Sequence, residues 1–286
     1  MEPRTVVITG ANTGIGLETA VSLAAVGDRV IIACRNADKA ATAVAEISLR
    51  ADSTLVEAVA LDLASFESIR ACAAELKKRC DAIDVLINNA GLVLSNRSTT
   101  TEGFETVFGV NHLGHFLLTD LLADLVKAAP APRVINLASA AHWFAVGGLN
   151  FDDLQSIRHY NIWVTYGRSK LANIYFTQEL AKRWKADGVS VSAVHPGMVR
   201  SEFGQDGDTA GITDSLLGLS RGFTISSVEG ADTSVWLATA GTGGDLERSG
   251  RYWTKRKEGI MAPWAKRPVD AARLWAASEE LIGTVG

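Results

Sequence analysis

Residues 5–16 decide the fold, and they read TVVITGANTGIG. The first five are β-branched or apolar, which predicts a buried strand. The next seven carry glycine at positions 10, 14 and 16, and residues 17–24 then have the periodicity of a helix. A strand, a glycine-rich turn and a helix in this order form the context in which a dinucleotide-binding turn occurs.

Each glycine of this turn has a separate expected role. We expect Gly10 to permit the tight turn, Gly14 to let the backbone approach a pyrophosphate, and Gly16 to allow close packing of the helix on the strand. The helix N-terminus would present its N–H groups to the phosphate charge. The spacing is GxxxGxG and not the GxGxxG of the standard fingerprint. An ordinary glycine-rich turn is the alternative, but the flanking strand and helix favour cofactor binding.

Buried apolar strands alternate with helices along the rest of the chain. Further strands are predicted at 29–34, 55–61, 84–88, 133–137, 189–195 and 250–253, and helices at 37–50, 65–80, 102–113, 116–128, 166–186, 226–238 and 269–281. The alternation predicts an α/β protein with a doubly wound parallel sheet of about seven strands and helices on both faces. We expect one Rossmann-fold domain over residues 1–286, with its ligands at the carboxyl ends of the strands.

Composition excludes several classes of protein. The 286 residues carry a formal net charge of −4 with both signs interspersed, so we expect neither a nucleic-acid nor a membrane-surface partner. Cys34, Cys72 and Cys80 form no CxxC pair, which fits a reducing compartment. The first strand begins close to Met1, and no run of about 18 apolar residues exists. We therefore expect a cytoplasmic protein without a signal peptide or membrane anchor.

Tyr166 and Lys170 are the strongest candidates for chemistry. They are four residues apart, so they share one face of the predicted helix. A free phenol titrates near pH ~10, and an ammonium group one turn away would lower its pKa by Coulomb attraction. Such a tyrosine suits general acid–base work at a carbonyl or alcohol oxygen. The spacing alone is common, so the prediction depends on the motifs around it.

Separate motifs, in order along almost the whole chain, closely resemble those of the short-chain dehydrogenase/reductase family. They are TGxxxGxG at 9–16, NNAG at 88–91, Asn111, Ser139, the YxxxK pair Tyr166 and Lys170, and Pro196-Gly197. Residues 11–16, 139–142 and 194–197 look most like the retinol-dehydrogenase-type and protochlorophyllide-reductase-like branch.

The resemblance implies a role for four side chains. Tyr166 would donate a proton to a carbonyl oxygen or remove one from an alcohol. Lys170 would lower the pKa of that tyrosine and bind the nicotinamide ribose, and Ser139 would hold the substrate oxygen. Asn111 would position a water that links Lys170 to solvent. The implied activity is NAD(P)-dependent interconversion of a carbonyl and an alcohol on a small apolar substrate.

Two other functions share part of this pattern. A non-catalytic NAD(P)-binding regulator of the same fold would have no chemical need for the four side chains. Sugar-nucleotide epimerases also use YxxxK, but their glycine motif is usually spaced GxxGxxG.

Cofactor choice depends on the residues after the second predicted strand. Cys34 stands where NAD enzymes usually place an acid, and Arg35 and Asn36 follow it. The planar guanidinium of Arg35 suits a 2′-phosphate, so we expect NADP(H) as the preferred cofactor and NAD(H) as the alternative. A solvent-exposed arginine without a ligand is the other interpretation of this residue.

Other cofactor positions follow from the resemblance. Asp62 and Leu63 would contact the adenine ring, and the 88–91 motif would line the middle of the cofactor. Ser201 stands where the family usually has a threonine that meets the nicotinamide amide. The complete expected set is Gly10, Asn12, Thr13, Gly14, Ile15, Gly16, Arg35, Asn36, Asp62, Leu63, Asn89, Ala90, Gly91, Tyr166, Lys170, Pro196, Gly197, Val199 and Ser201.

The second half of the chain carries the features expected to bind the substrate. We expect a dinucleotide-binding half at about 1–140, a catalytic and substrate half at about 141–286, and a lid at about 198–225. Ser139 and Tyr166 are 27 apart, more than in many family members. The aromatic-rich segment 142–165 between them is either a surface loop that buries its aromatics locally or a lip over an apolar substrate.

The sequence also leads to expectations for three histidines and for the oligomeric state of the protein. His142 is a candidate substrate contact because it lies close to Ser139 in sequence. His112 and His115 lack a third metal ligand, so we expect structural roles for them. The resemblance also implies a homodimer or homotetramer that pairs through the helices at 116–128 and 166–186.

Overall fold

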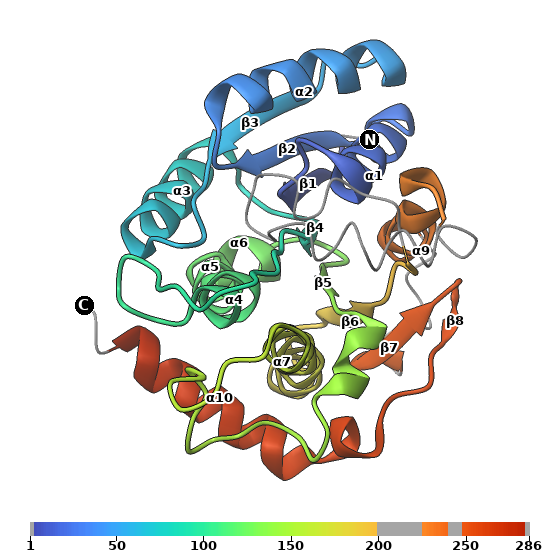
Figure 1. Cartoon of the computed structure of the whole chain (residues 1–286). Coiled ribbons are helices and arrows are strands. Elements are labelled where there is room, and N and C mark those ends of the chain that lie inside the picture. Colours follow the sequence, from blue (N-terminus) through green and yellow to red (C-terminus); the bar gives the residue numbers. More distant parts are fainter. Residues whose placement is uncertain (1–2, 199–224, 240–247, 284–286) are drawn as a thin grey trace.

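The computed structural model describes residues 3–198, 225–239 and 248–283. Within these ranges eight strands form one sheet in the order β3-β2-β1-β4-β5-β6-β7-β8 (Figure 1). The strands are β1 Thr5–Thr9, β2 Arg29–Cys34, β3 Val56–Ala60, β4 Val85–Asn88, β5 Arg133–Leu137, β6 Ser190–Val194, β7 Arg251–Thr254 and β8 Lys257–Glu258.

The predicted parallel α/β sheet is confirmed. Strands β1 to β7 pair in parallel, and only the short β8, which was not predicted, pairs antiparallel with β7. The strand order reverses beside β1, where β2 and β4 lie on either side of it. In open α/β sheets such a reversal opens a crevice at the carboxyl ends of the strands.

Side chains on opposite faces of the sheet belong to two separate cores. In β1, Val6 and Ile8 pack into one core, whereas Val7 packs into the other. This alternation follows from the two-residue period of a strand. All three side chains are fully buried, which explains why the run reads as continuously apolar.

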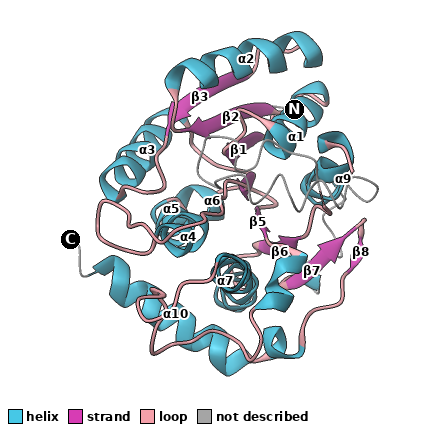
Figure 2. Cartoon of the chain, viewed as in Figure 1, coloured by secondary structure: helices cyan, strands magenta, loops and turns pink. Residues whose placement is uncertain are grey.

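Helices cover both faces (Figure 2). The core of Val6 and Ile8 contains residues of α1 Gly14–Ala25, α2 Ala37–Ala51 and α9 Ser227–Thr239. The core of Val7 contains residues of α3 Phe66–Arg79, α5 Gly114–Leu121, α7 Ile162–Arg183 and α10 Pro268–Gly283. Trp275 of α10 contacts both Phe116 of α5 and Phe176 of α7, so α10 packs against both helices.

The two helices predicted at 102–113 and 116–128 are divided differently. Helix α4 Thr106–Phe108 runs through a π-helical turn at Gly109–Leu113 into α5 without a break, and the interruption comes at Leu122, before α6 Ala123–Lys127. Glu105 fixes the start, because its carboxylate accepts from the amides of Val107 and Phe108 at 2.7 Å each. A wide turn changes the period of the pattern, so the sequence periodicity placed the break wrongly.

Helix α7 begins one turn earlier than predicted. Asn161 caps it by accepting from the amides of Trp163 and Val164 at 3.1 Å. Tyr166 therefore lies inside the helix and not at its first residue. The remaining short elements are the 3₁₀ turns η2 Ala140–Phe144 and η4 Pro263–Lys266.

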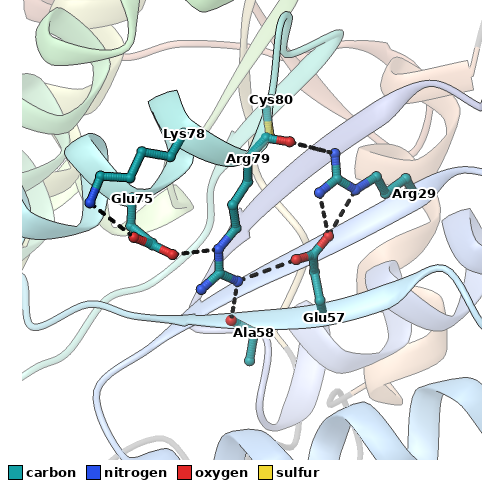
Figure 3. Close-up of polar contacts among 7 residues, drawn as sticks. All are labelled: Arg29, Glu57, Ala58, Glu75, Lys78, Arg79 and Cys80. Carbon is teal, nitrogen blue, oxygen red and sulfur yellow. Dashed lines mark hydrogen bonds and ion pairs between the residues drawn. The ribbon is translucent and has the colours of Figure 1, made fainter.

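Ion pairs join α3 to the amino ends of β2 and β3 (Figure 3). Glu57 binds Arg29 at 2.6 Å and Arg79 at 3.2 Å, and Arg79 also binds Glu75 at 2.8 Å. Lys78 lies 3.7 Å from Glu75, and Arg29 donates to the carbonyl of Arg79. We call the side chains of Arg29, Glu57, Glu75, Lys78 and Arg79 the amino-end network.

Two expectations concern the whole chain. Among the helices that can be described, none is both long and apolar enough to cross a membrane. The predicted lid at 198–225 lies outside the described residues except for Met198 and Ile225.

Candidate active site

A cleft of about 510 Å³ opens at the carboxyl ends of β1, β2, β4, β5 and β6. Its lining includes every expected cofactor residue that the structure describes. Val199 and Ser201 lie outside the described residues. The cleft volume is in the usual range for small-molecule sites. The other lining residues are Ala33, Cys34, Lys39, Leu61, Ala64, Leu92, Val93, Thr106, Val110, Leu137, Ala138 and Ser139.

The glycine turn at one end of the cleft has the geometry that a pyrophosphate requires. Gly10 and Gly14 have φ of 65° and 58°, in the left-handed region that favours glycine. A Cβ on Gly16 would lie 2.5 Å from Asn89 Nδ2 and 2.7 Å from the carbonyl of Gly10. Thr13 precedes α1 and makes no side-chain cap, so its hydroxyl leaves the first N–H groups of that helix to a ligand. These features fit a bound dinucleotide.

The Thr9 hydroxyl holds three segments together beside this turn. It accepts from the amides of Asn89 and Ala90 at 2.9 Å each and lies 2.9 Å from His115 Nε2. A hydroxyl has one hydrogen, so with both acceptor positions used it donates to His115. His115 Nδ1 then carries the proton and donates to the carbonyl of Asn111 at 3.2 Å.

His112 and His115 are both buried among protein groups. His112 Nε2 lies 2.9 Å from the Ser278 hydroxyl. Burial lowers the pKa of His112 to about 3 and that of His115 to about 4, so both rings stay neutral. Nowhere in the described ranges do three potential metal ligands gather.

Ser139, Tyr166 and Lys170 meet at the other end of the cleft. Ser139 lies two residues after the end of β5, and Tyr166 and Lys170 come from α7. Lys170 Nζ is 5.6 Å from the centre of the Tyr166 ring and donates to the carbonyl of Leu137 at 3.2 Å. The Ser139 side chain also lies close enough to the Tyr166 hydroxyl to lower the pKa of that phenol. The structure thus brings together the residues that sequence spacing placed far apart.

The pKa of Tyr166 differs from the expectation. Burial raises it to about 12, against the lowering effect of the hydrogen bond with Ser139. Burial also lowers the pKa of Lys170 to about 8. The expected lowering of the tyrosine pKa by its lysine neighbour is therefore not seen. The reason is that burial removes the phenolate from water, and this outweighs the hydrogen bond with Ser139.

Asn111 lies behind the cleft and not in its lining. Its Nδ2 donates to the Leu92 carbonyl and to the Ser169 hydroxyl at 2.9 Å each, and its Oδ1 accepts from the Leu92 amide at 2.8 Å. The side chain therefore ties the segment after β4 to α7. A Cβ on Gly91 would lie 3.2 Å from Lys170 Nζ and 3.3 Å from Asn111 Oδ1, so glycine there lets these two groups approach.

Comparisons with known proteins decide the family. The family described as short chain dehydrogenase matches residues 4–210. The chain belongs to the short-chain dehydrogenase family.

Its relatives place this short-chain dehydrogenase in the retinol-dehydrogenase-like branch. It is 44% identical to retinol dehydrogenase 13 of Homo sapiens over 284 residues, which cover 98% of this chain and 85% of the relative. It is 45% identical to retinol dehydrogenase 12 of Mus musculus over 281 residues, covering 98% and 86%. The protein is accordingly an NAD(P)-dependent oxidoreductase.

Two solved structures are similar to the chain over most of its length. A crystal structure of a protein from Mycobacterium paratuberculosis is 35% identical with a TM-score of 0.76, and the match covers 97% of this chain and 92% of that one. The Pseudomonas aeruginosa RhlG complex with NADP is 26% identical with a TM-score of 0.68, covering 88% and 96%.

Two cations line the cleft of this short-chain dehydrogenase next to the glycine turn, on the side away from Tyr166. Arg35 lies there as predicted, and Lys39, which the sequence reasoning missed, lines the same end. Asn36 caps α2 by accepting from the Lys39 amide at 2.8 Å, so the lysine lies in the first turn of that helix. A lysine four residues after Arg35 was the available signal. Asp62 accepts from the Ala64 amide at 2.9 Å.

The aromatic segment 142–165 does not line the cleft of this dehydrogenase. Trp143 packs on Trp264 with ring centres 6.0 Å apart, and Phe144 packs on Trp163 at 6.2 Å. Tyr160 donates to the Leu94 carbonyl at 2.7 Å. These contacts favour local packing over a lip on the substrate.

His142 is not a substrate contact. The ring is fully buried, and protein groups bind both of its nitrogens. The sequence suggested otherwise because His142 follows Ser139 by three residues, but the 3₁₀ turn η2 directs the ring inward.

Proposed function

We propose that the protein interconverts a carbonyl and an alcohol on a small apolar substrate with NADP(H). One observation carries the proposal: Ser139, Tyr166 and Lys170 converge at one end of the cleft whose other end holds the glycine turn. When bound, the dinucleotide supplies or accepts the hydride. The protein provides orientation and electrostatics.

Each of the three side chains has a task that its position supports. Tyr166 donates a proton to the carbonyl oxygen in reduction and removes one from the alcohol in oxidation. Ser139, bonded to Tyr166, holds the same oxygen. Lys170 places a positive charge beside the phenol and would bind the nicotinamide ribose of the cofactor. With its pKa raised to about 12, Tyr166 is protonated at neutral pH and so holds the proton that carbonyl reduction requires.

NADP(H) is proposed over NAD(H) because of the charge at the adenosine end. Arg35 and Lys39 both line this end, and the position directly after β2 carries no carboxylate. Two cations suit a 2′-phosphate, and the guanidinium can bind it through two donors. The NADP complex of RhlG, 26% identical to this chain, supports the same choice.

The substrate class is proposed from the relatives and from the sequence. The similar curated proteins are named retinol dehydrogenases, so a retinoid or another apolar aldehyde is the first substrate to test. The substrate would enter beside Ser139 and Tyr166.

The first experiment combines a substrate panel with Tyr166→Phe. Purified protein is assayed with NADPH and retinal, aliphatic aldehydes or aromatic aldehydes, and with NADP⁺ and the matching alcohols. We expect Tyr166→Phe to lower kcat by about 10²- to 10⁴-fold. NADPH binding, followed by its fluorescence, should stay unchanged. Near-normal turnover in this variant would refute the role of Tyr166, and binding without turnover in the wild type would favour the regulator.

The second experiment tests cofactor choice. Arg35→Ala should raise the KM for NADPH by about tenfold or more, because the pair with a phosphate is charge-assisted. The KM for NADH should change little. Arg50→Ala is the matched control, since Arg50 lies on α2, the helix that follows Arg35, but binds Glu18 and Glu46. An equal effect of Arg35→Ala on both cofactors would refute the phosphate contact.

We also propose a homodimer or homotetramer, as the family resemblance implies. Trp275 of α10 packs against Phe116 and Phe176, so pairing through α5 and α7 would have to involve α10 as well. Light scattering on the eluted protein would give the mass, and a monomer at all concentrations would refute the proposal.

A further inference from the structure

A buried histidine joins the turn that follows Ser139 to the C-terminal part of the chain. His142 lies in η2 and is 0% exposed. Its Nδ1 is 2.6 Å from the carbonyl oxygen of Ser139. On the other side of the ring, Nε2 accepts a hydrogen bond from the amide of Ala262 at 3.1 Å. The ring therefore bridges two segments that are more than a hundred residues apart in sequence.

The two partners determine where the single ring proton sits. A carbonyl oxygen can only accept, so Nδ1 must carry the hydrogen that it donates to Ser139. A backbone amide can only donate, so Nε2 must be without a hydrogen to accept from Ala262. His142 is thus the neutral ring with its proton on Nδ1. Burial, which lowers its pKa, agrees with this state.

Further bonds clamp the same turn. The main-chain carbonyl of His142 accepts from Trp264 Nε1 at 3.1 Å, and Tyr175 of α7 donates to the Trp264 carbonyl. On the opposite side of the turn, His195 Nδ1 accepts from the Ala140 amide at 3.3 Å. The turn after Ser139 is therefore held by His195, which follows β6, and by Trp264 of η4, which Tyr175 of α7 binds in turn.

We propose that His142 is a positioning residue for the reaction: by holding the carbonyl of Ser139, it keeps the hydroxyl of that serine on Tyr166. The inference rests on the proposed function, in which Ser139 binds the substrate oxygen. The serine hydroxyl and the carbonyl that His142 binds belong to one residue, so a rotation of this peptide moves the hydroxyl. A misplacement of about 1 Å in an active site can cost about 10²-fold in rate.

The geometry also assigns a task to the C-terminal segment. Ala262 and Trp264 do not line the cleft, yet both bind His142. They fix the ring and the turn from behind. In this arrangement residues 262–264 support the oxygen-binding serine without touching the substrate.

Two conservative variants separate the two ring bonds. His142→Asn places an amide nitrogen near the position of Nδ1, so it can still donate to Ser139. His142→Gln extends its amide toward the position of Nε2, so it keeps the contact with Ala262 and loses the one with Ser139. We expect His142→Asn to retain kcat within about threefold, and His142→Gln to lower kcat by about tenfold or more. The KM for NADPH should be unchanged in both.

Ser278→Ala is the matched control for stability. Ser278 is also fully buried and binds a histidine ring, but it lies on α10 away from the cleft. Its loss should lower the melting temperature without changing kcat. Assays of all variants are made well below the lowest melting temperature, so that unfolding does not enter the rates.

The outcomes distinguish the possible failures. Equal kcat for His142→Gln and the wild type would overturn the positioning role. Full activity in Ser139→Ala, with Tyr166→Phe inactive, would refute the role of Ser139 within the proposed function. A structural readout is independent of turnover: in crystals of His142→Gln the Ser139 hydroxyl should have moved away from Tyr166, and in His142→Asn it should not. An unmoved hydroxyl in His142→Gln would overturn the proposal even in a chain that shows no activity.

Discussion

The two edges of the sheet differ in how their charged side chains are paired and exposed. At the carboxyl edge, Lys170 is buried beside the cleft, and no carboxylate of the described residues lies within ion-pair distance of it. At the other edge, the amino-end network places Glu57 between two arginines that are each about one-third exposed (Figure 3). One edge holds a charge that its surroundings disfavour, and the other pairs its charges at the surface.

The buried charge of Lys170 serves the proposed reaction, whereas the ion pairs of Glu57 serve the stability of the fold. A shift in the pKa of Lys170 from 10.5 to about 8 corresponds to roughly 3 kcal/mol against its charged form. A half-exposed ion pair contributes only about 0–1 kcal/mol. The cleft therefore lowers the stability of the protein more than any one pair of the network raises it. Such local costs are common where side chains are arranged for chemistry.

The largest effect should come from Lys170→Met. Turnover should fall by about 10²-fold or more, because the charge beside Tyr166 is lost. In the absence of cofactor the variant should resist urea better than the wild type at neutral pH, since the buried charge is gone. Urea midpoints and kcat measure the two effects.

The pH dependence of Lys170→Met has a definite sign. Because folding lowers the pKa of Lys170, the unfolded chain binds more protons between about pH 8 and pH 10.5. Wild-type stability should gain from this group as the pH rises through that window, and the variant should lose that gain. A variant less stable than the wild type at neutral pH would contradict the contrast between the two edges.

Gly16→Ala should have the next largest effect. Its Cβ would lie 2.5 Å from Asn89 Nδ2, so the turn or the 88–91 segment must move. We expect a loss of about 1–3 kcal/mol in stability and a weaker binding of NADPH. Gly283→Ala is the control, because no atom lies within 4 Å of the Cβ it would add. Unchanged NADPH affinity in Gly16→Ala would show that the close contact is not needed.

Glu57→Gln should have the smallest effect. Removing this carboxylate leaves Arg29 and Arg79 without their shared partner, and we expect a loss of about 0.5–1 kcal/mol. The loss should shrink in about 1 M salt, where charges are screened beyond about 3 Å. Urea unfolding at low and high salt measures it. Any change in kcat would mean that the two edges are coupled.

Much of the fold could be predicted because the strands are buried on both faces. Val6, Val7 and Ile8 are all apolar and β-branched, so no polar residue interrupts the signal. The sequence does not predict the short β8, because its two residues, Lys257 and Glu258, are both charged. The predicted start of α7 is four residues late, because the cap that begins the helix is the single polar residue Asn161. In both cases short polar signals were outweighed by apolar ones.

The candidate site was predictable where a motif fixes it and not where distant contacts do. The glycine turn and the Tyr166–Lys170 spacing are local, and the structure brings both to one cleft. The raised pKa of Tyr166 depends on burial, which the sequence does not display. The bonds between Asn111 and Leu92 join residues on different elements, so their spacing in sequence carries no signal.

The π-helical turn at Gly109–Leu113 holds one residue more than a turn of α-helix would need at the same place. Deleting one residue there would restore an ordinary helix with nearly the same rotation and rise, so α5 would keep its direction. His115 would stay beside Thr9, and the proton that bridges β1 to α5 would keep its acceptor. A one-residue gap at this turn in an alignment of relatives is therefore compatible with the same site.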